Sequence, residues 1–175
     1  MNEQPGTPTD SSSLIYLAKV DGLAYAHACL GVLLIPPTVW REVVLRGEER
    51  AAPELKAIRI AVESRQVVAL GLEKPDLLQA EKLRQAHRLD AGECEVLVLG
   101  ASRSLVLMDE LRATKAGISM GLRVIPALIL PALALQAGVL DEPQALASLQ
   151  RLARVSTARA DDVNKIESLI REGTS

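Results

Sequence analysis

Short apolar runs alternate along the chain with longer segments in which apolar residues recur every three to four positions. The short runs are rich in Val, Ile and Leu and are bounded by turn residues, which predicts buried strands at residues 31–35, 66–70, 104–108 and 122–125. The periodic segments predict helices at about residues 12–19, 39–45, 52–64, 76–87, 111–116, 128–137, 144–152 and 161–171, and a further helix from Asp90. Strands that are apolar on both faces and alternate with helices are typical of a parallel sheet covered by helices on both sides.

Polar residues and prolines mark where several of these elements begin or end. Asp10 precedes the apolar run of the first helix, as an N-cap residue does. The two prolines at 36–37 close the strand before them, and we expect Thr38 to cap the next helix. Asp90 with Glu93 three residues later has the pattern of a capping box, which places a helix start there.

Residues 124–140 form an uncharged stretch whose length approaches the ~20 residues of a membrane-spanning helix. The stretch contains Pro126, Pro131, Gln136 and Gly138, which a spanning helix seldom combines. A buried strand followed by a buried helix explains it better, so we predict no membrane span.

Composition narrows the function classes. The chain has 175 residues, a hydrophobic fraction of 49% and a net charge of -2, as expected for one globular domain and not for a basic nucleic-acid wrapper. Aromatic residues make up 2% with no Phe, which argues against a platform for stacked bases. Two Cys and two His are too few for a disulfide framework or a zinc knuckle and make a Ser–His–Asp triad improbable. The polar N-terminus lacks an apolar leader, which favours a cytoplasmic protein.

Acidic residues fall at element boundaries that share one edge of the predicted sheet. Asp109 and Glu110 follow the strand at 104–108, Asp10 precedes the first helix, and Glu42 and Glu93 lie in the first turns of later helices. Ligands of open parallel sheets bind outside the carboxyl ends of the strands. Mg²⁺ prefers carboxylate oxygens, water and phosphate, and it can activate water against a phosphodiester without any histidine. The pattern therefore predicts a divalent-cation site.

Structural interpretations of the same acids stay open at this point. Asp10 can act as a helix N-cap, and this role is compatible with metal binding. Asp90 is better explained as a cap than as a ligand, and the capping box competes for Glu93 as well. Glu42 can be a solvated acid on a helix. Asp109 is the hardest to explain structurally, because an acid at the tip of a buried strand is seldom needed for folding.

Four segments together resemble the PIN-domain nucleases, in particular a short prokaryotic PIN-like branch. They are DSSSLIYLAK at 10–19, PTVWREV at 37–43, LDAGECE at 89–95 and LMDELR at 107–112. Each segment alone is weakly specific, but they occur in the order of that family and at about its spacing. The resemblance covers most of residues 10–140.

The resemblance implies a Mg²⁺- or Mn²⁺-dependent ribonuclease with a quartet of acids. Carried over by position, the catalytic and metal-binding residues are Asp10, Glu42, Glu93 and Asp109, with Glu95 as a less favoured substitute for Glu93. The same comparison implies substrate contacts from Ser11, Ser12 and Arg112. It also implies an RNA substrate, a homodimer and, as in many relatives, a small antitoxin protein as the partner of a toxin.

Two departures from the family pattern matter. The lead-in at residues 3–9 has poor strand propensity, so we expect the first strand to be short, distorted or absent. After the strand at 122–125 the chain reads Pro126-Ala127-Leu128 where relatives tend to be rich in Gly and Thr, which suggests a lost substrate contact.

The resulting prediction is an α/β fold. It is a single PIN-like domain with a central, mostly parallel sheet of four to five short strands and helices on both faces. Residues 1–150 would form the nuclease domain, and residues 151–175 a linker, at about 153–160, and a helix that packs on the same domain. The predicted activity is endoribonuclease. The main alternative is a catalytically silent PIN-like module that binds RNA or a protein partner. A domain like a response regulator is disfavoured, because no strand-end Lys accompanies the acids.

Overall fold

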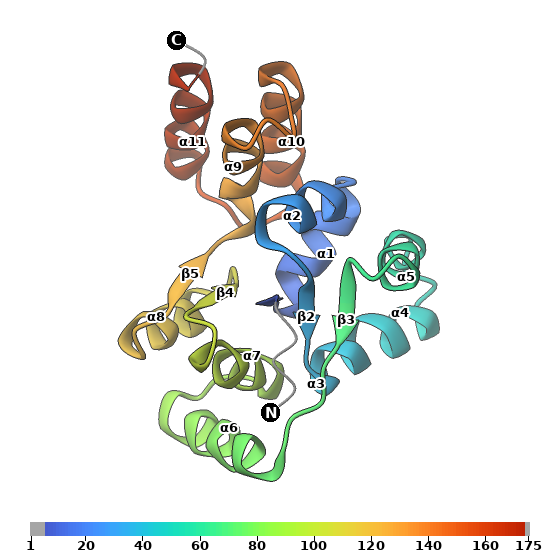
Figure 1. Ribbon diagram of the computed structural model, residues 1–175, viewed down its shortest axis with the longest axis vertical. Coiled ribbons are helices and arrows are strands. Elements are labelled where there is room, and N and C mark those ends of the chain that lie inside the picture. Colours follow the sequence, from blue (N-terminus) through green and yellow to red (C-terminus); the bar gives the residue numbers. More distant parts are fainter. Residues whose placement is uncertain (1–5, 174–175) are drawn as a thin grey trace.

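The computed structural model describes residues 6–173, and five short parallel strands lie at its centre (Figure 1). The strands are β1 (Thr7–Pro8), β2 (Leu33–Ile35), β3 (Val67–Ala69), β4 (Leu105–Leu107) and β5 (Arg123–Ile125). β2 pairs with β1 and β3, and β4 pairs with β5. An isolated parallel bridge between Thr9 and Leu107 joins the two sheets, so the strand order is β3-β2-β1-β4-β5.

The first strand is short, as its composition led us to expect. The Thr7 amide donates to the Val32 carbonyl at 2.8 Å, and the Thr9 amide donates to the Leu34 carbonyl at 2.9 Å, so this edge of β1 pairs with β2. Successive residues of a strand point their amides to opposite sides, and Pro8 therefore lacks the donor that would face β4. This explains why β1 joins β4 only by a bridge. Residues 3–5 of the lead-in lie outside the described residues.

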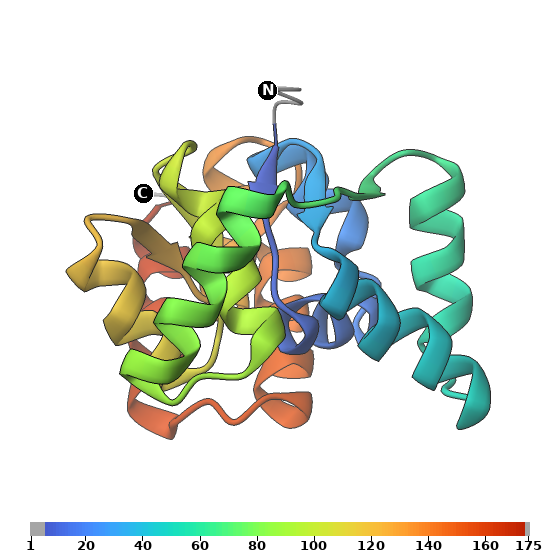
Figure 2. The ribbon, with the colours of Figure 1, turned by 90° about the horizontal axis from the view of Figure 1, so that it is seen from below.

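The helices lie on both sides of the sheet, and this confirms the predicted fold class. On one side are α1 (Ser11–Lys19), α2 (Leu23–Leu30) and α5 (Leu55–Glu63), and on the other are α6 (Lys74–His87), α7 (Ala91–Ala101) and α8 (Leu111–Ser119) (Figures 1 and 2). Between β2 and α5 the chain forms α3 (Pro37–Trp40), a π-helical turn at Arg41–Leu45 and α4 (Arg46–Glu49). After β5 come a 3₁₀ turn at Ala127–Ile129 and the helices α9 (Leu130–Gln136), α10 (Glu142–Val155) and α11 (Ala160–Glu172).

The sequence pattern located most elements but missed some boundaries. α2 was not predicted, because its residues are mostly apolar on every face and show no helical period. The helix predicted at 39–45 spans 37–49 in three consecutive helical pieces, and its N-cap is Pro36 instead of Thr38. α10 extends to Val155, which shortens the predicted linker at 153–160 to the four residues before α11.

Two apolar clusters hold the helices in place. The larger cluster surrounds the sheet and includes the fully buried Leu14, Leu33 and Leu107. The smaller one lies among α9, α10 and α11 and includes Leu149 and Ile170. The uncharged stretch at 124–140 thus forms the end of β5, a 3₁₀ turn and the short α9. Among residues 6–173 we find no helix with the length and apolar character that crossing a membrane requires.

Candidate active site at the carboxyl ends of the strands

The order of the strands creates a switch point beside β1, where the chain stops adding strands on one side of β1 and continues on the other. From β1 the chain builds outward through β2 and β3, and it then returns to place β4 on the other side of β1. Ligand sites of open α/β sheets lie outside the carboxyl ends of the strands at such a switch point. Asp10 follows β1 and Asp109 follows β4, so these two acids flank the switch point.

Asp10 and Asp109 lie next to each other. The Asp10 amide donates to the Leu107 carbonyl at 3.1 Å, which fixes the end of β1 beside β4. The Asp109 amide is 3.4 Å from Asp10 Oδ2. Asp10 is buried, with 3% of its surface exposed, whereas Asp109 remains partly open to solvent. The structure therefore brings together two of the four predicted acids directly, from segments about a hundred residues apart.

Ser13 joins the two carboxylates. Its backbone amide donates to Asp10 Oδ1 at 2.8 Å, and its hydroxyl donates to Asp109 Oδ2 at 2.6 Å. The Ala127 amide lies 3.2 Å from each of the two Asp109 oxygens. Pro126-Ala127, where we expected a lost contact, thus supplies a backbone donor to the site.

Burial makes this pair of acids harder to ionise. Loss of hydration on burial raises the pKa of Asp10 to about 6, the nearby Asp109 charge adds to this, and the hydrogen bonds from Ser13 oppose it. Burial also raises the pKa of Asp109, against hydrogen bonds from Ser13 and Ala127. Within the described part of the chain, no Lys or Arg forms an ion pair with either acid. The pair therefore has hydrogen-bond donors but no cation to balance its charge.

Glu42 reaches the same region through a serine. It lies in the π-helical turn, and its Oε2 accepts a hydrogen bond of 2.5 Å from the hydroxyl of Ser11, the residue that follows Asp10. Gly92 on α7 lies near this carboxylate, since a Cβ atom there would be in ordinary contact with Glu42 Oε2 at 3.5 Å. Single π-turns inside helices are frequent at functional sites, where they turn a side chain.

The two acids of α7 point to different neighbours. Glu93 completes the predicted capping box by accepting from the Asp90 amide at 2.8 Å. Burial raises its pKa, and the Asp90 amide lowers it. Glu95 is buried and accepts from the Thr38 amide at 3.0 Å and from the Thr38 hydroxyl at 2.7 Å. Glu93 therefore caps its own helix, while Glu95 holds the start of α3.

The predicted quartet is not gathered into one cluster. In residues 6–173, no three His, Cys, Asp or Glu side chains lie close enough to hold a metal ion together. A divalent cation nevertheless fits the residues present, since Mg²⁺ is commonly held by one or two carboxylates with water and phosphate completing its shell. Asp10 and Asp109 supply such a pair, and no Lys or Arg among residues 6–173 balances their charge in an ion pair.

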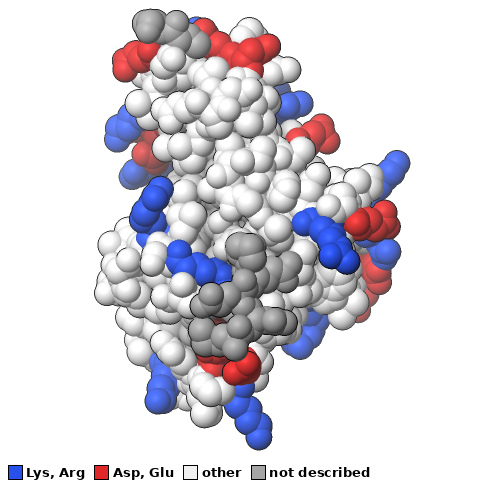
Figure 3. Space-filling model, viewed as in Figure 1, with Lys and Arg blue, Asp and Glu red and all other residues white. Residues whose placement is uncertain are grey.

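The predicted substrate contacts lie around this pair with different exposure. Ser11 is engaged with Glu42, and Ser12 is partly exposed. Arg112 has a 70% exposed side chain whose Nε is 3.6 Å from Glu110, and Glu110 caps α8 by accepting from the Ala113 amide at 2.8 Å. On the face shown in Figure 3, acidic and basic side chains are interspersed among wide uncharged areas, so any RNA contact on this face must be local.

Sequence reasoning missed Ser13 and Tyr16. Ser13 stands three residues after the N-cap Asp10, which is the spacing of a capped amide, and this signal was available. Tyr16 lies one turn later on the same face of α1, and the Asp109 and Asp10 charges both raise its pKa after the larger effect of burial. Residues three apart lie on one face of a helix, so the position of Ser13 would have indicated Tyr16.

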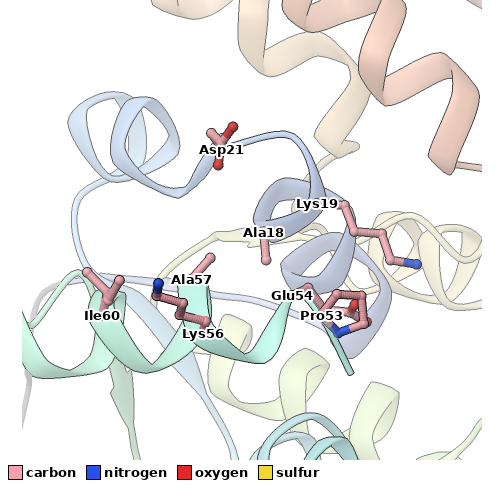
Figure 4. Close-up of a pocket in the computed structure, with 8 residues that line it drawn as sticks. All are labelled: Ala18, Lys19, Asp21, Pro53, Glu54, Lys56, Ala57 and Ile60. Carbon is pink, nitrogen blue, oxygen red and sulfur yellow. The ribbon is translucent and has the colours of Figure 1, made fainter. Parts of the chain in front are cut away.

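A pocket of about 450 Å³ lies away from these acids, between the end of α1 and α5 (Figure 4). Its lining residues are Ala18, Lys19, Asp21, Pro53, Glu54, Lys56, Ala57 and Ile60. None of them belongs to the predicted site, and the charged members balance in sign. The carboxylates of the switch point remain the better candidate.

Comparison with known proteins gives the family. The model of a PIN-domain family matches residues 9–167, which span the site and all the strands from β2 to β5. No curated protein and no solved structure matches the chain. PIN domains are generally nucleases and typically use divalent metal ions. Because the match covers most of its length, the chain belongs to the PIN-domain family.

Proposed function

We propose that this protein is a Mg²⁺- or Mn²⁺-dependent endoribonuclease. The observation that carries the proposal is the adjacent pair of Asp10 and Asp109, buried or half-buried at the switch point, with no ion pair to a Lys or Arg of the described chain. Glu42 and Glu93 would complete the predicted quartet, directly or through water. Family membership supports nuclease chemistry in general, and the choice of RNA and of the metal is part of the proposal.

The residues around the two acids each have a role in this proposal. Ser13 and the Ala127 amide hold Asp109 in one orientation, so its carboxylate is preorganised. Ser11, the residue after Asp10, restrains Glu42 by donating to its carboxylate. A bound divalent cation would supply Lewis-acid stabilisation of the negative charge on the phosphodiester. Arg112 is exposed and close to Glu110, from where it would bind the RNA backbone by charge.

The acid from α7 has two candidates. Glu93 is the predicted one, and its pKa responds to the charges of Glu110 and Arg112, so it faces the start of α8. Glu95 is the substitute, and it lies on the same helix face as Gly92, where an added Cβ atom would lie 3.5 Å from Glu42 Oε2. We keep Glu93 as the proposed ligand, because its movement would break one capping-box bond, whereas movement of Glu95 would leave the Thr38 amide and hydroxyl without their acceptor.

The direct test is RNA cleavage by wild type and by Asp109→Asn in Mg²⁺ or Mn²⁺. We expect Asp109→Asn to abolish cleavage while it leaves the circular dichroism spectrum near that of wild type and does not lower the urea midpoint. Asp161→Asn on the exposed first turn of α11 is the matched control and should cleave normally. A fully active Asp109→Asn protein would exclude the assignment.

The second candidate is a catalytically silent PIN-like module that binds RNA or a protein. The absence of a three-acid cluster among the described residues favours it. Mn²⁺ titration separates the two, because only a competent site raises the melting temperature through binding to the folded state. If millimolar Mn²⁺ caused no thermal shift and no cleavage, the silent module would be established. The toxin role, the antitoxin partner and the homodimer remain predictions.

A further inference from the structure

One face of α1 carries hydroxyl groups in successive turns beside the acids. Ser12 and Ser13 lie in the first turn, and Tyr16 follows at the i+3 and i+4 positions, which share a face of a helix. Ser13 is already bonded to Asp109. Tyr16 is therefore the next side chain along the surface that leads away from the two carboxylates.

The Tyr16 side chain is partly buried and partly exposed to solvent. Its ring is half-buried and packs against the C-terminal apolar cluster, which contains Leu128 and Leu149. Its phenol lies near the hydroxyls of Ser12 and Thr157, and within range of the Asp109 charge. Thr157 belongs to the connection between α10 and α11, which runs along the lower edge of the molecule in Figure 2. Packing thus supports the ring, and the Ser12 and Thr157 hydroxyls lie near its polar end.

A neutral donor at this place suits an anionic ligand. Asp10 and Asp109 are acceptors that repel a phosphate oxygen until a cation intervenes. The neighbouring hydroxyls can donate to the phenol oxygen, which leaves the phenolic proton free for a ligand. The tyrosine keeps this proton at neutral pH, since burial and the two acids disfavour the phenolate.

We propose that Tyr16 is a substrate-positioning residue whose hydroxyl donates to a backbone phosphate oxygen of the nucleic acid bound at Asp10 and Asp109, with Thr157 holding the phenol. The proposal deepens the function proposed above and rests on it. It assigns a contact to the C-terminal part of the chain, which none of the predicted site residues uses. It also gives this chain, poor in aromatic residues, a specific use for one of its two tyrosines.

Steady-state cleavage of a single-stranded RNA in Mn²⁺ tests this contact. Tyr16→Phe keeps the ring and removes the hydroxyl, so we expect KM to rise about tenfold with kcat within about twofold of wild type. Thr157→Val should raise KM in the same direction by about threefold, because it only loosens the phenol.

Tyr25→Phe is the matched control. It removes the phenol that bonds Ser148 at 2.8 Å in the core, so it should lower the urea midpoint and leave KM unchanged. If wild type cleaves and Tyr16→Phe shows wild-type kinetics, the inference alone fails. A fall in kcat at constant KM would also overturn it, because it would place Tyr16 in the chemical step. If wild type does not cleave at all, the proposed function fails, and this inference fails with it.

Discussion

Asp10 serves two purposes with its two oxygens. Oδ1 accepts from the Ser13 amide and caps α1, while Oδ2 faces the Asp109 amide. The structural and the functional interpretations of this residue are therefore compatible. Its helix-capping geometry fixes the side chain at the switch point, and the energy of the cap compensates part of the cost of burying a carboxylate.

The raised pKa of Asp10 makes a prediction about stability. With a folded pKa of about 6 against 3.8 unfolded, the folded state binds more protons between these values. The stabilisation is fully present below pH 3.8 and is lost as the pH rises through 6, by about 3 kcal/mol at full effect. Partial burial of Asp109 acts in the same direction.

Urea unfolding in EDTA between pH 4 and pH 7 measures this effect. Asp10→Asn should remove most of the decline that wild type shows as the pH rises. If wild type and Asp10→Asn had parallel profiles over this range, the carboxyl group would not be buried as described.

Ser13→Ala separates the orientation of Asp109 from the helix cap. The cap uses the backbone amide of residue 13 and survives, whereas the hydroxyl bond to Asp109 is lost. We expect the cleavage rate to fall about 10–100-fold, as for other groups that orient metal ligands. Ser119→Ala, which removes a hydroxyl bond to the Ala116 carbonyl in α8, is the control. Equal rates for both variants would show that the Ser13 hydroxyl is dispensable.

Glu93 and Glu95 of α7 reach different partners because of their positions around the helix axis. Glu93 and Glu95 are two residues apart and therefore point about 200° away from each other around the helix axis. One caps the helix beside Asp90, and the other crosses to Thr38 at the start of α3. Pro36, the N-cap of α3, has no side-chain acceptor for the Thr38 amide, so Glu95 accepts from that amide from another element.

Amide substitutions test which acid of α7 acts in catalysis. Glu93→Gln preserves the capping box, because Gln can accept from the same amide, so stability should not change. We expect cleavage to fall about 10–100-fold in Glu93→Gln. An active Glu93→Gln protein beside an inactive, folded Glu95→Gln protein would instead assign the position to Glu95.

At the level of elements, the sequence predicted the structure well where the hydrophobic pattern and the turn residues indicated the same boundary. The strands ending at Ile35 and Leu107 were predicted to within two residues, because β-branched or leucine-rich runs met turn residues. The helical run at 37–49 was predicted too short at its C-terminal end, where α4 continues the helix across Gly47 although glycine weakens a helix interior. α2 was missed because its residues are mostly apolar, including Ala24 and Ala28 on its exposed face, so no polar stripe marks the helical period.

At the scale of the whole molecule, strand order does most to assemble the site. Asp10 and Asp109 could be predicted to meet, because both follow strands of one parallel sheet and such ends share an edge. The positions of Glu42 and Glu93 could not, because they depend on helix rotation and on the partners Ser11 and Asp90. The sequence pattern could not predict the contact of Tyr16 with the C-terminal cluster either.

The C-terminal helices are tied to the rest of the molecule by a buried polar bond. Ser148 on α10 donates to the Tyr25 hydroxyl on α2 at 2.8 Å, and Ser148 is 1% exposed. Ser148→Ala should lower the free energy of unfolding by about 1–3 kcal/mol, because it leaves the phenol unsatisfied. Ser168→Ala, on exposed α11, should change it by less than about 0.5 kcal/mol. Equal urea midpoints for the two variants would contradict this account.

If acids from distant segments form one cation site, the metal-free protein should bind Mn²⁺ through them. Thermal unfolding with a hundredfold excess of Mn²⁺ over its Kd should raise the melting temperature of wild type by about 5–10 °C. Asp10→Asn and Asp109→Asn should abolish the shift, and Asp161→Asn should retain it. A wild-type melting temperature that does not move at millimolar Mn²⁺, or an equal shift in the Asp10 and Asp109 variants, would contradict the account.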